Sequence, residues 1–110
     1  MDFNKKKNLS IDILEISGKL DAAGSEIAQE AIIQNITEGG KLIIDLAGCD
    51  YVSSAGLRVL LIAAKQSAMA NCKMVVTGIQ PGVWEIIFMT GFEEVLETYP
   101  TQADAIKALD

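Results

Sequence analysis

The sequence predicts an α/β fold with a mainly parallel sheet of roughly four to five strands and about four helices. Short runs rich in isoleucine and valine alternate along the chain with stretches whose apolar residues recur at helical spacing. Strands joined through helices are parallel, with right-handed crossovers. The 110 residues suit a single domain (1–110), and because half of them are apolar the chain can bury a sizeable core.

The N-terminal part predicts a strand followed by a helix. LSIDILEIS (9–17) alternates apolar and polar residues as a strand does, and Gly18 ends this pattern. The preceding DFNKKKN is either a short edge strand or a frayed arm, since lysines suit a sheet edge. AAGSEIAQEAIIQNITE (22–38) carries isoleucines at helical spacing, beginning with Ile27, and a glycine pair ends the predicted helix.

The rest of the chain continues the alternation. Apolar runs predict strands at LIIDL (42–46) and CKMVVT (72–77), and a weaker one at EVLETY (94–99). Helices are predicted between and after these strands, at about 55–70, 81–90 and 101–109. Pro81 suits a first helical turn, Gly91 ends that helix, and Thr101 is the expected N-cap of the last helix, with Asp104 in a capping box.

Composition and charge exclude several classes of function. The net charge is −6 and no basic stripe is visible beyond Lys5, Lys6 and Lys7, so a nucleic-acid partner is not expected. The chain has no apolar run of about 18 residues and no signal-peptide pattern, so we expect no membrane insertion and a cytoplasmic location. Cys49 and Cys72 lack metal-site spacing and are interpreted as small thiols in or near the core.

The residue types present also argue against an enzyme. The chain contains no histidine, the commonest general base and metal ligand, and no glycine-rich phosphate loop. We therefore expect no catalytic residues, no cofactor and no metal. One alternative stays open, in which Asp21, Asp45 and Asp50 hold a metal for a nucleotide-binding or enzymatic role. Their simpler interpretation is as solvated turn and cap residues.

Two adjacent serines stand in DYVSSAGLR (50–58), between a predicted strand and a predicted helix. A loop at the carboxyl end of a parallel strand is the usual functional edge of such a sheet. A serine here can accept a hydrogen bond from a free N–H group, so the simplest role is an N-cap. The helix start also tolerates an anion because of its partial positive charge, so the position suits a reversible phosphorylation switch.

The helix that follows has two distinct faces. One stripe is mixed apolar and basic: Ser54, Arg58, Ile62 (or Leu61), Lys65 and Met69. The opposite face is small and apolar, as expected against a sheet: Leu57, Leu60, Ala64 and Ser67 or Ala68. From one turn after Ser54, Arg58 could reach a phosphate on that serine or an acidic partner. The alternative is that Ile62 and Met69 pack on a neighbouring helix and Arg58 is solvated.

Three segments together resemble STAS domains, specifically the stand-alone anti-sigma factor antagonists of bacteria. GKLDAAGS (18–25) is similar to the family's glycine-x-leucine-aspartate turn. LIIDLAGCDYVSSAGLRVLL (42–61) is similar to its central strand and serine motif, and GFEEVLETYPTQADAIKAL (91–109) to its closing segment. The resemblance implies a right-handed βα superhelix with an early antiparallel strand.

The resemblance also implies a function. In that family an anti-sigma serine kinase phosphorylates the motif serine, the unphosphorylated form binds the kinase and frees a sigma factor, and a phosphatase restores it. Register with Gly56 and Leu57 makes Ser54 the motif serine, with Ser53 as the alternative acceptor. Ser53 stands where the family usually has aspartate. Asp21 and Asp45 match recurrent acidic positions of the family.

The expected partner-binding surface combines the motif with the stripe below it. Its residues are Asp21, Ser53, Gly56, Leu57, Arg58, Ile62 and Lys65. The alternative function is a STAS module that serves as a regulatory or scaffold subunit of a transporter, lipid-transport or stressosome-like complex. VWEIIFM (83–89) is apolar nearly all round, with Trp84 and Phe88 one turn apart, which leaves open a weak homodimer contact or a second docking site.

Overall fold

A computed structural model describes residues 1–110 as one five-stranded sheet with strands in chain order, β1-β2-β3-β4-β5. The strands are β1 Asp2–Asn8, β2 Ile11–Leu20, β3 Lys41–Val52, β4 Lys73–Thr77 and β5 Thr98–Tyr99. The helices are α1 Ala22–Ile33, α2 Ser54–Met69, α3 Pro81–Thr90 and α4 Gln102–Leu109, with a 3₁₀ turn η1 at Phe92–Glu94. β1 is antiparallel to β2 and all other pairs are parallel, which confirms the predicted mainly parallel α/β fold.

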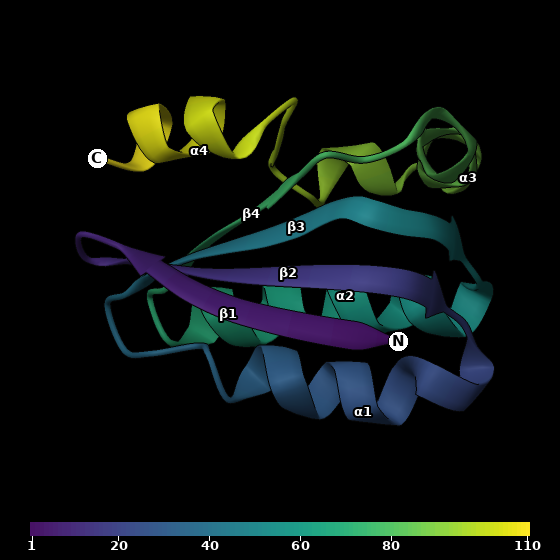
Figure 1. The fold of residues 1–110 in the computed structure, drawn as a ribbon, viewed down its shortest axis with the longest axis horizontal. Coiled ribbons are helices and arrows are strands. Elements are labelled where there is room, and N and C mark those ends of the chain that lie inside the picture. Colours follow the sequence, from purple (N-terminus) through teal and green to yellow (C-terminus); the bar gives the residue numbers. More distant parts are fainter.

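The sheet separates two hydrophobic cores of unequal size. The larger, of 19 buried residues, joins one face of β2, β3 and β4 to α1, α2 and α3. The smaller, of six buried residues, lies under α4. Figure 1 shows α4 on the opposite side of the sheet from α1 and α2. This division follows from the strand period of two, since Leu42 and Ile44 point to the larger core while Ile43 between them points to the smaller.

Two of the predicted elements in the N-terminal part are wrong at their ends. β2 does not end at Gly18 but runs on to Leu20, because a register shift against β3 accommodates this glycine at a φ of 103°. α1 ends at Ile33 and not near residue 38, with the chain turning at 34–35. Ile27, with which the predicted helical spacing begins, is 62% exposed. The residues that α1 buries against the core are Ala28 and Ile32.

The C-terminal part also differs from expectation at one element. The predicted strand 94–99 is reduced to the two residues of β5, because η1 extends to Glu94 and the chain turns at 95–96. α3 begins at Pro81 as predicted, and Gly91 ends it in a left-handed conformation. Thr101 is the N-cap of α4, where its hydroxyl accepts from the Asp104 N–H group and donates to the Asp104 carboxylate. DFNKKKN forms the exposed edge strand β1 and not a frayed arm.

The longest strand places the serine pair. β3 continues past the predicted end of LIIDL to Val52, so that only Ser53 separates it from α2. The motif therefore has almost no loop, and its geometry is fixed by the sheet on one side and the helix on the other. Cys49 and Cys72 are both buried free thiols, as expected, and burial raises the pKa of each. None of the helices is both long and apolar enough to cross a membrane.

Candidate functional site

Ser53 is the N-cap of α2 and is held on several sides. Its backbone is extended (φ −83°, ψ 176°), and its Oγ accepts a hydrogen bond from the Gly56 N–H group at 3.2 Å. The same hydroxyl donates to the Leu20 carbonyl oxygen at 3.4 Å, and the Ser53 N–H group donates to that oxygen at 3.0 Å. Ser53 thus joins the end of β2 to the start of α2, which confirms the predicted cap role and assigns it to the first serine of the pair.

Ser54 is the first residue of α2 and has a different environment. It is exposed, whereas Ser53 is half-buried, and its hydroxyl makes no hydrogen bond within the chain. The first turn of α2 holds no acidic residue, so the partial positive charge of the helix end is not offset there. A negatively charged group on the Ser54 oxygen would therefore be stabilised by its local environment without breaking an existing contact.

Gly56 is required by close packing and not by backbone conformation. A Cβ atom at this position would lie 2.3 Å from the Leu20 carbonyl oxygen and 2.7 Å from the Leu20 Cγ atom. These distances are far below any real carbon contact, so the start of α2 approaches the end of β2 more closely than any side chain allows. Gly56 is buried, so its contribution to the expected partner surface is to bring Ser53 and Ser54 into position.

The stripe of α2 that begins at Ser54 is largely exposed. Arg58, Lys65 and Met69 are exposed and Ile62 is half-buried. On the inner face Leu57, Leu60 and Ser67 are buried, as predicted. Val59 and Ala63 are buried there as well, whereas the predicted Ala64 is half-buried and Ala68 is exposed. Because Leu57 is buried, it presents only an edge to a partner. The helix contains no Asp or Glu, so its exposed charges are both positive in a chain of net charge −6.

A groove lies between the first two turns of α2 and the α3–η1 segment, with a volume of about 250 Å³. Ser54, Leu57, Arg58 and Leu61 form one wall, and Ile86, Thr90 and Phe92 form the other. Most of this lining is apolar, and the rim carries the Ser54 hydroxyl and the Arg58 side chain. Sequence reasoning did not find the second wall. No periodic signal connects it to the serine motif, and only the packing of α3 beside α2 brings it there.

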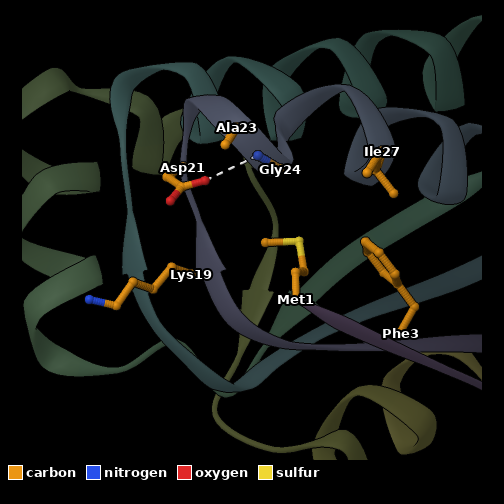
Figure 2. Close-up of a pocket in the computed structure, with 7 residues that line it drawn as sticks. All are labelled: Met1, Phe3, Lys19, Asp21, Ala23, Gly24 and Ile27. Carbon is orange, nitrogen blue, oxygen red and sulfur yellow. Dashed lines mark hydrogen bonds between the residues drawn. The ribbon is translucent and has the colours of Figure 1, made fainter.

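A second cavity, of about 450 Å³, lies at the start of α1. Asp21 is the N-cap of α1, and its Oδ1 atom accepts from the Gly24 N–H group at 3.0 Å. Figure 2 shows Met1, Phe3 and Ile27 directed toward one space, with Lys19 extending away from them. Lys19 reaches over the Tyr51 ring, 5.9 Å from its centroid. Asp21 is therefore a cap, as its simpler interpretation predicted, and lies beside an apolar hollow.

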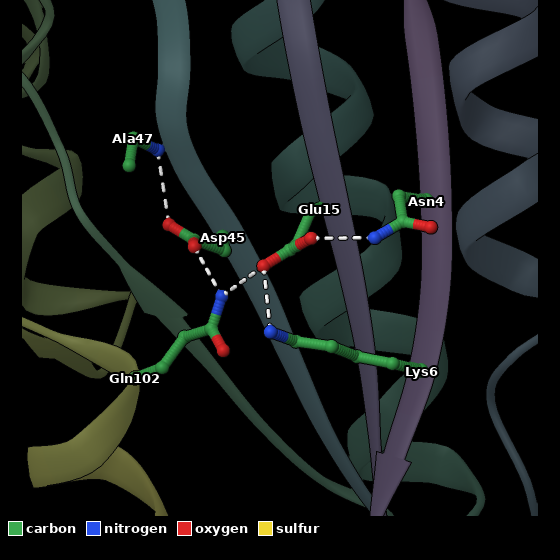
Figure 3. Close-up of polar contacts among 6 residues, drawn as sticks. All are labelled: Asn4, Lys6, Glu15, Asp45, Ala47 and Gln102. Atoms are coloured by element: carbon green, nitrogen blue, oxygen red, sulfur yellow. Dashed lines mark hydrogen bonds and ion pairs between the residues drawn. The ribbon is translucent and has the colours of Figure 1, made fainter.

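Asp45 lies on the α4 side of the sheet, in a polar network. It is buried, and its carboxylate accepts hydrogen bonds from the Ala47 N–H group and from the Gln102 amide. Figure 3 shows the same amide shared with Glu15, which also contacts two side chains of β1, Asn4 and Lys6.

The hydrogen bond from Asn4, then those from Gln102 and Lys6, lower the pKa of Glu15 from 4.5 to about 2. Asp45 has a structural role here, in joining α4 to the sheet. The proposed acidic cluster of Asp21, Asp45 and Asp50 is not formed, since no three potential metal ligands come together in the structure.

α3 exposes part of its apolar surface. Val83 and Ile87 are buried, whereas Phe88 is 60% and Met89 80% exposed. Trp84 is half-buried and packs against Phe88, with ring centroids 5.0 Å apart and ring planes inclined at 39°. VWEIIFM (83–89) is thus only partly buried in the core. Its exposed side is where a dimer contact or a second docking site would lie, and both stay predictions.

Comparisons with known proteins agree with the observed fold. The family model described as the STAS domain matches residues 2–105. A protein of Bordetella bronchiseptica named as a candidate anti-sigma factor antagonist, BtrV, is 32% identical over 78 residues, which cover 70% of this chain and 67% of that protein.

Two solved structures share the fold. An anti-sigma factor antagonist from Mycobacterium paratuberculosis is 22% identical, with a TM-score of 0.87 over 97% of this chain and 92% of its own. The Bacillus cell fate determinant SpoIIAA in its phosphorylated form is 15% identical, with a TM-score of 0.73 over 99% of this chain and 100% of its own. The chain belongs to the STAS domain family, and its relatives there are named as anti-sigma factor antagonists.

Proposed function

We propose that this protein is an anti-sigma factor antagonist that binds an anti-sigma serine kinase and is switched off when that kinase phosphorylates Ser54. Its unphosphorylated form would hold the kinase and free a sigma factor, so the protein would regulate sigma-factor-dependent transcription by partner switching. A phosphatase would restore the binding form. The protein acts in this scheme as the substrate of an enzyme and not as an enzyme itself.

The observation that carries this proposal is the different environment of the two serines. The Ser53 hydroxyl already makes two hydrogen bonds, to Gly56 and Leu20, and is half-buried. The Ser54 hydroxyl is exposed and makes none, at the positive end of a 16-residue helix. Ser54 is thus the better acceptor, and its modification leaves the cap of α2 in place.

The phosphoryl transfer requires only the Ser54 hydroxyl from this protein. The Ser54 oxygen would form a bond to the γ-phosphorus of ATP held by the kinase, while the bond from that phosphorus to the β,γ-bridging oxygen breaks and ADP leaves. The hydroxyl proton would pass to a base of the kinase or to solvent. The product gains close to two negative charges, placed one turn before Arg58.

Ser53 replaces the aspartate usual in the family without loss of the cap. Aspartate and serine are about equally good N-caps, and Ser53 makes the expected bond to the third helical residue. The replacement removes a carboxylate beside the acceptor, so the start of α2 is less negative. A phosphate on Ser54 would therefore meet less local repulsion than in a protein with aspartate at this position.

The test is to incubate the protein with the cognate anti-sigma kinase and ATP, and to locate the phosphate by mass spectrometry. We expect it on Ser54, with Ser54→Ala binding the kinase but not released by ATP, and Ser54→Asp binding weakly. Absence of phosphate from Ser54, together with unchanged kinase binding by Ser54→Asp, would overturn the proposal. That result would favour the alternative role of a STAS scaffold or transporter module, which does not require the serine.

A further inference from the structure

The α2–α3 groove, defined by the seven lining residues given above, carries an inference that rests on the proposed function and makes it more specific. We propose that this groove receives an apolar side chain of the kinase, and that a carboxylate next to that side chain pairs with Arg58. Phosphorylation of Ser54 would then release the kinase by changing the charge at the rim of the groove.

The shape and lining of the groove favour an apolar anchor. Its volume of about 250 Å³ can accommodate a side chain the size of leucine or phenylalanine, and its walls are mostly aliphatic or aromatic. Leu57 forms part of the lining and is itself only 3% exposed, so the walls are held by the core. A pre-formed apolar pocket at the centre of a contact is where a few residues supply most of the binding energy.

Charge complementarity indicates which groups accompany the anchor. Arg58 is exposed and takes part in no ion pair, and the only other charged residue of α2 is Lys65 on the same stripe. The opposite side of the groove continues into η1, which carries Glu93 and Glu94. A docking segment should therefore place its carboxylate toward α2, where the guanidinium and the helix N-terminus both attract it.

The position of Ser54 on the same rim explains how a phosphate would act. Ser54 and Arg58 both line the groove, and side chains of a helix lean toward its N-terminus. A phosphate on Ser54 would pair with Arg58 and add negative charge where the partner's carboxylate must lie. The attraction thus becomes repulsion while the apolar walls stay unchanged. No movement of the backbone is needed.

The test measures binding of the purified cognate kinase by calorimetry to variants of the whole chain. We expect Leu61→Asp to weaken binding about 30-fold, as for a central contact residue. Arg58→Glu should weaken kinase binding about tenfold, and the remaining binding should no longer depend on the salt concentration. Leu9→Asn and Lys5→Glu are the matched controls, since both residues are exposed on or beside the edge strand at other parts of the surface. Both controls should bind as the wild type does.

Circular dichroism checks that Leu61→Asp is folded. If it is not folded, Arg58→Glu alone tests the proposal, because Arg58 is exposed and its substitution should leave the fold intact. A photo-crosslinking residue at Thr90, on the groove rim, should capture a kinase segment in which an apolar residue adjoins Asp or Glu. Two results would refute the groove proposal while the proposed function stands, provided that the kinase phosphorylates Ser54. One is that the kinase binds Arg58→Glu and folded Leu61→Asp as tightly as wild type. The other is that the captured kinase segment is polar or basic. If wild type neither binds nor is phosphorylated, both the groove proposal and the proposed function fail.

Discussion

α1 and α2 begin at the same end of the sheet, directly after the paired strand residues Leu20 and Val52, and the segments that start them, DAAG (21–24) and SSAG (53–56), are arranged alike. In each helix the N-cap side chain accepts from the N–H group of the glycine three residues on, at 3.0 Å in α1 and 3.2 Å in α2. The two starts differ in what surrounds this shared cap. α1 has an anionic cap and no hydroxyl at its first residue, whereas α2 has a neutral cap and the free hydroxyl of Ser54.

This difference distinguishes the structural part of the serine motif, the cap, from the part that we propose is functional, the free hydroxyl of Ser54. A cap is needed at both helix starts, so the cap alone identifies no functional site. What is particular to α2 is a glycine required by close packing, a positive helix end without a carboxylate, and an exposed hydroxyl directly after the cap. The following predictions test that distinction, from the largest expected effect to the smallest.

The two glycines should respond very differently to alanine. Gly56→Ala forces a Cβ atom to within 2.3 Å of a carbonyl oxygen, so we expect a loss of about 3 kcal/mol in the free energy of unfolding. A Cβ atom at Gly24 would meet only ordinary contacts at 3.5 Å, so Gly24→Ala should be neutral or stabilise by about 0.5 kcal/mol. Urea denaturation followed by circular dichroism measures both. Equal effects of the two substitutions would contradict the packing argument.

Acid should weaken the fold through Glu15, which lies away from both helix starts. Because its pKa is lowered to about 2 in the folded state, its contribution is fully present above pH 4.5 and is lost as the pH falls toward 2. Glu15→Gln should remove this part of the pH dependence, as should Asn4→Ala in part. Unfolding free energies measured from pH 6 to pH 2 test this, and an unchanged slope in Glu15→Gln would refute it.

The two caps should contribute similarly. Asp21→Ala and Ser53→Ala are each expected to lower the free energy of unfolding by about 1 kcal/mol, since each removes a cap hydrogen bond and the second bond lost in Ser53→Ala, to the Leu20 carbonyl oxygen, is long at 3.4 Å. Ser53→Asp restores the cap and should retain wild-type stability to within about 0.5 kcal/mol. Thermal melts of the three variants provide the measurement. A Ser53→Ala variant as stable as wild type would show that the hydrogen bonds of the Ser53 hydroxyl, to Gly56 and Leu20, do not contribute to stability.

The smallest effect on stability is expected at Ser54. Its hydroxyl makes no bond in the structure, so Ser54→Ala should change the free energy of unfolding by less than about 0.5 kcal/mol. Ala22→Ser, the matched change at the first residue of α1, should be equally mild. A marked destabilisation by Ser54→Ala would mean that this serine has a structural role as well.

The sequence predicts the main helices and strands because the spacing of apolar residues shows which face of each element is buried. The alternation within LSIDILEIS and the apolar run LIIDL identify strands that the structure contains, and α3 has its predicted bounds 81–90. Element ends are less predictable, since they depend on neighbouring strands. Gly18 reads as a breaker in isolation, but pairing of β2 with β3 carries the strand through it.

Only one wall of the α2–α3 groove could be predicted from the sequence. Arg58 and Lys65 could be found because they lie at regular spacing on one helix, and Ser54 because it begins that stripe and matches the serine of the family motif. Ile86, Thr90 and Phe92 could not, because their place on the opposite wall depends on how α3 packs beside α2. The close approach that makes Gly56 necessary is likewise a tertiary contact, between segments more than 30 residues apart.

The most direct test of the central claim compares the two helix starts as kinase substrates. Wild type, Ser54→Ala, Ser53→Ala and Ala22→Ser are each incubated with the cognate anti-sigma kinase and ATP, and phosphorylated residues are located by mass spectrometry. We predict phosphate on Ser54 in every variant that retains it, none at residue 22 of Ala22→Ser, and none anywhere in Ser54→Ala. Phosphate on Ser53, or undiminished phosphorylation of Ser54→Ala, would contradict the assignment of Ser54 as the switch.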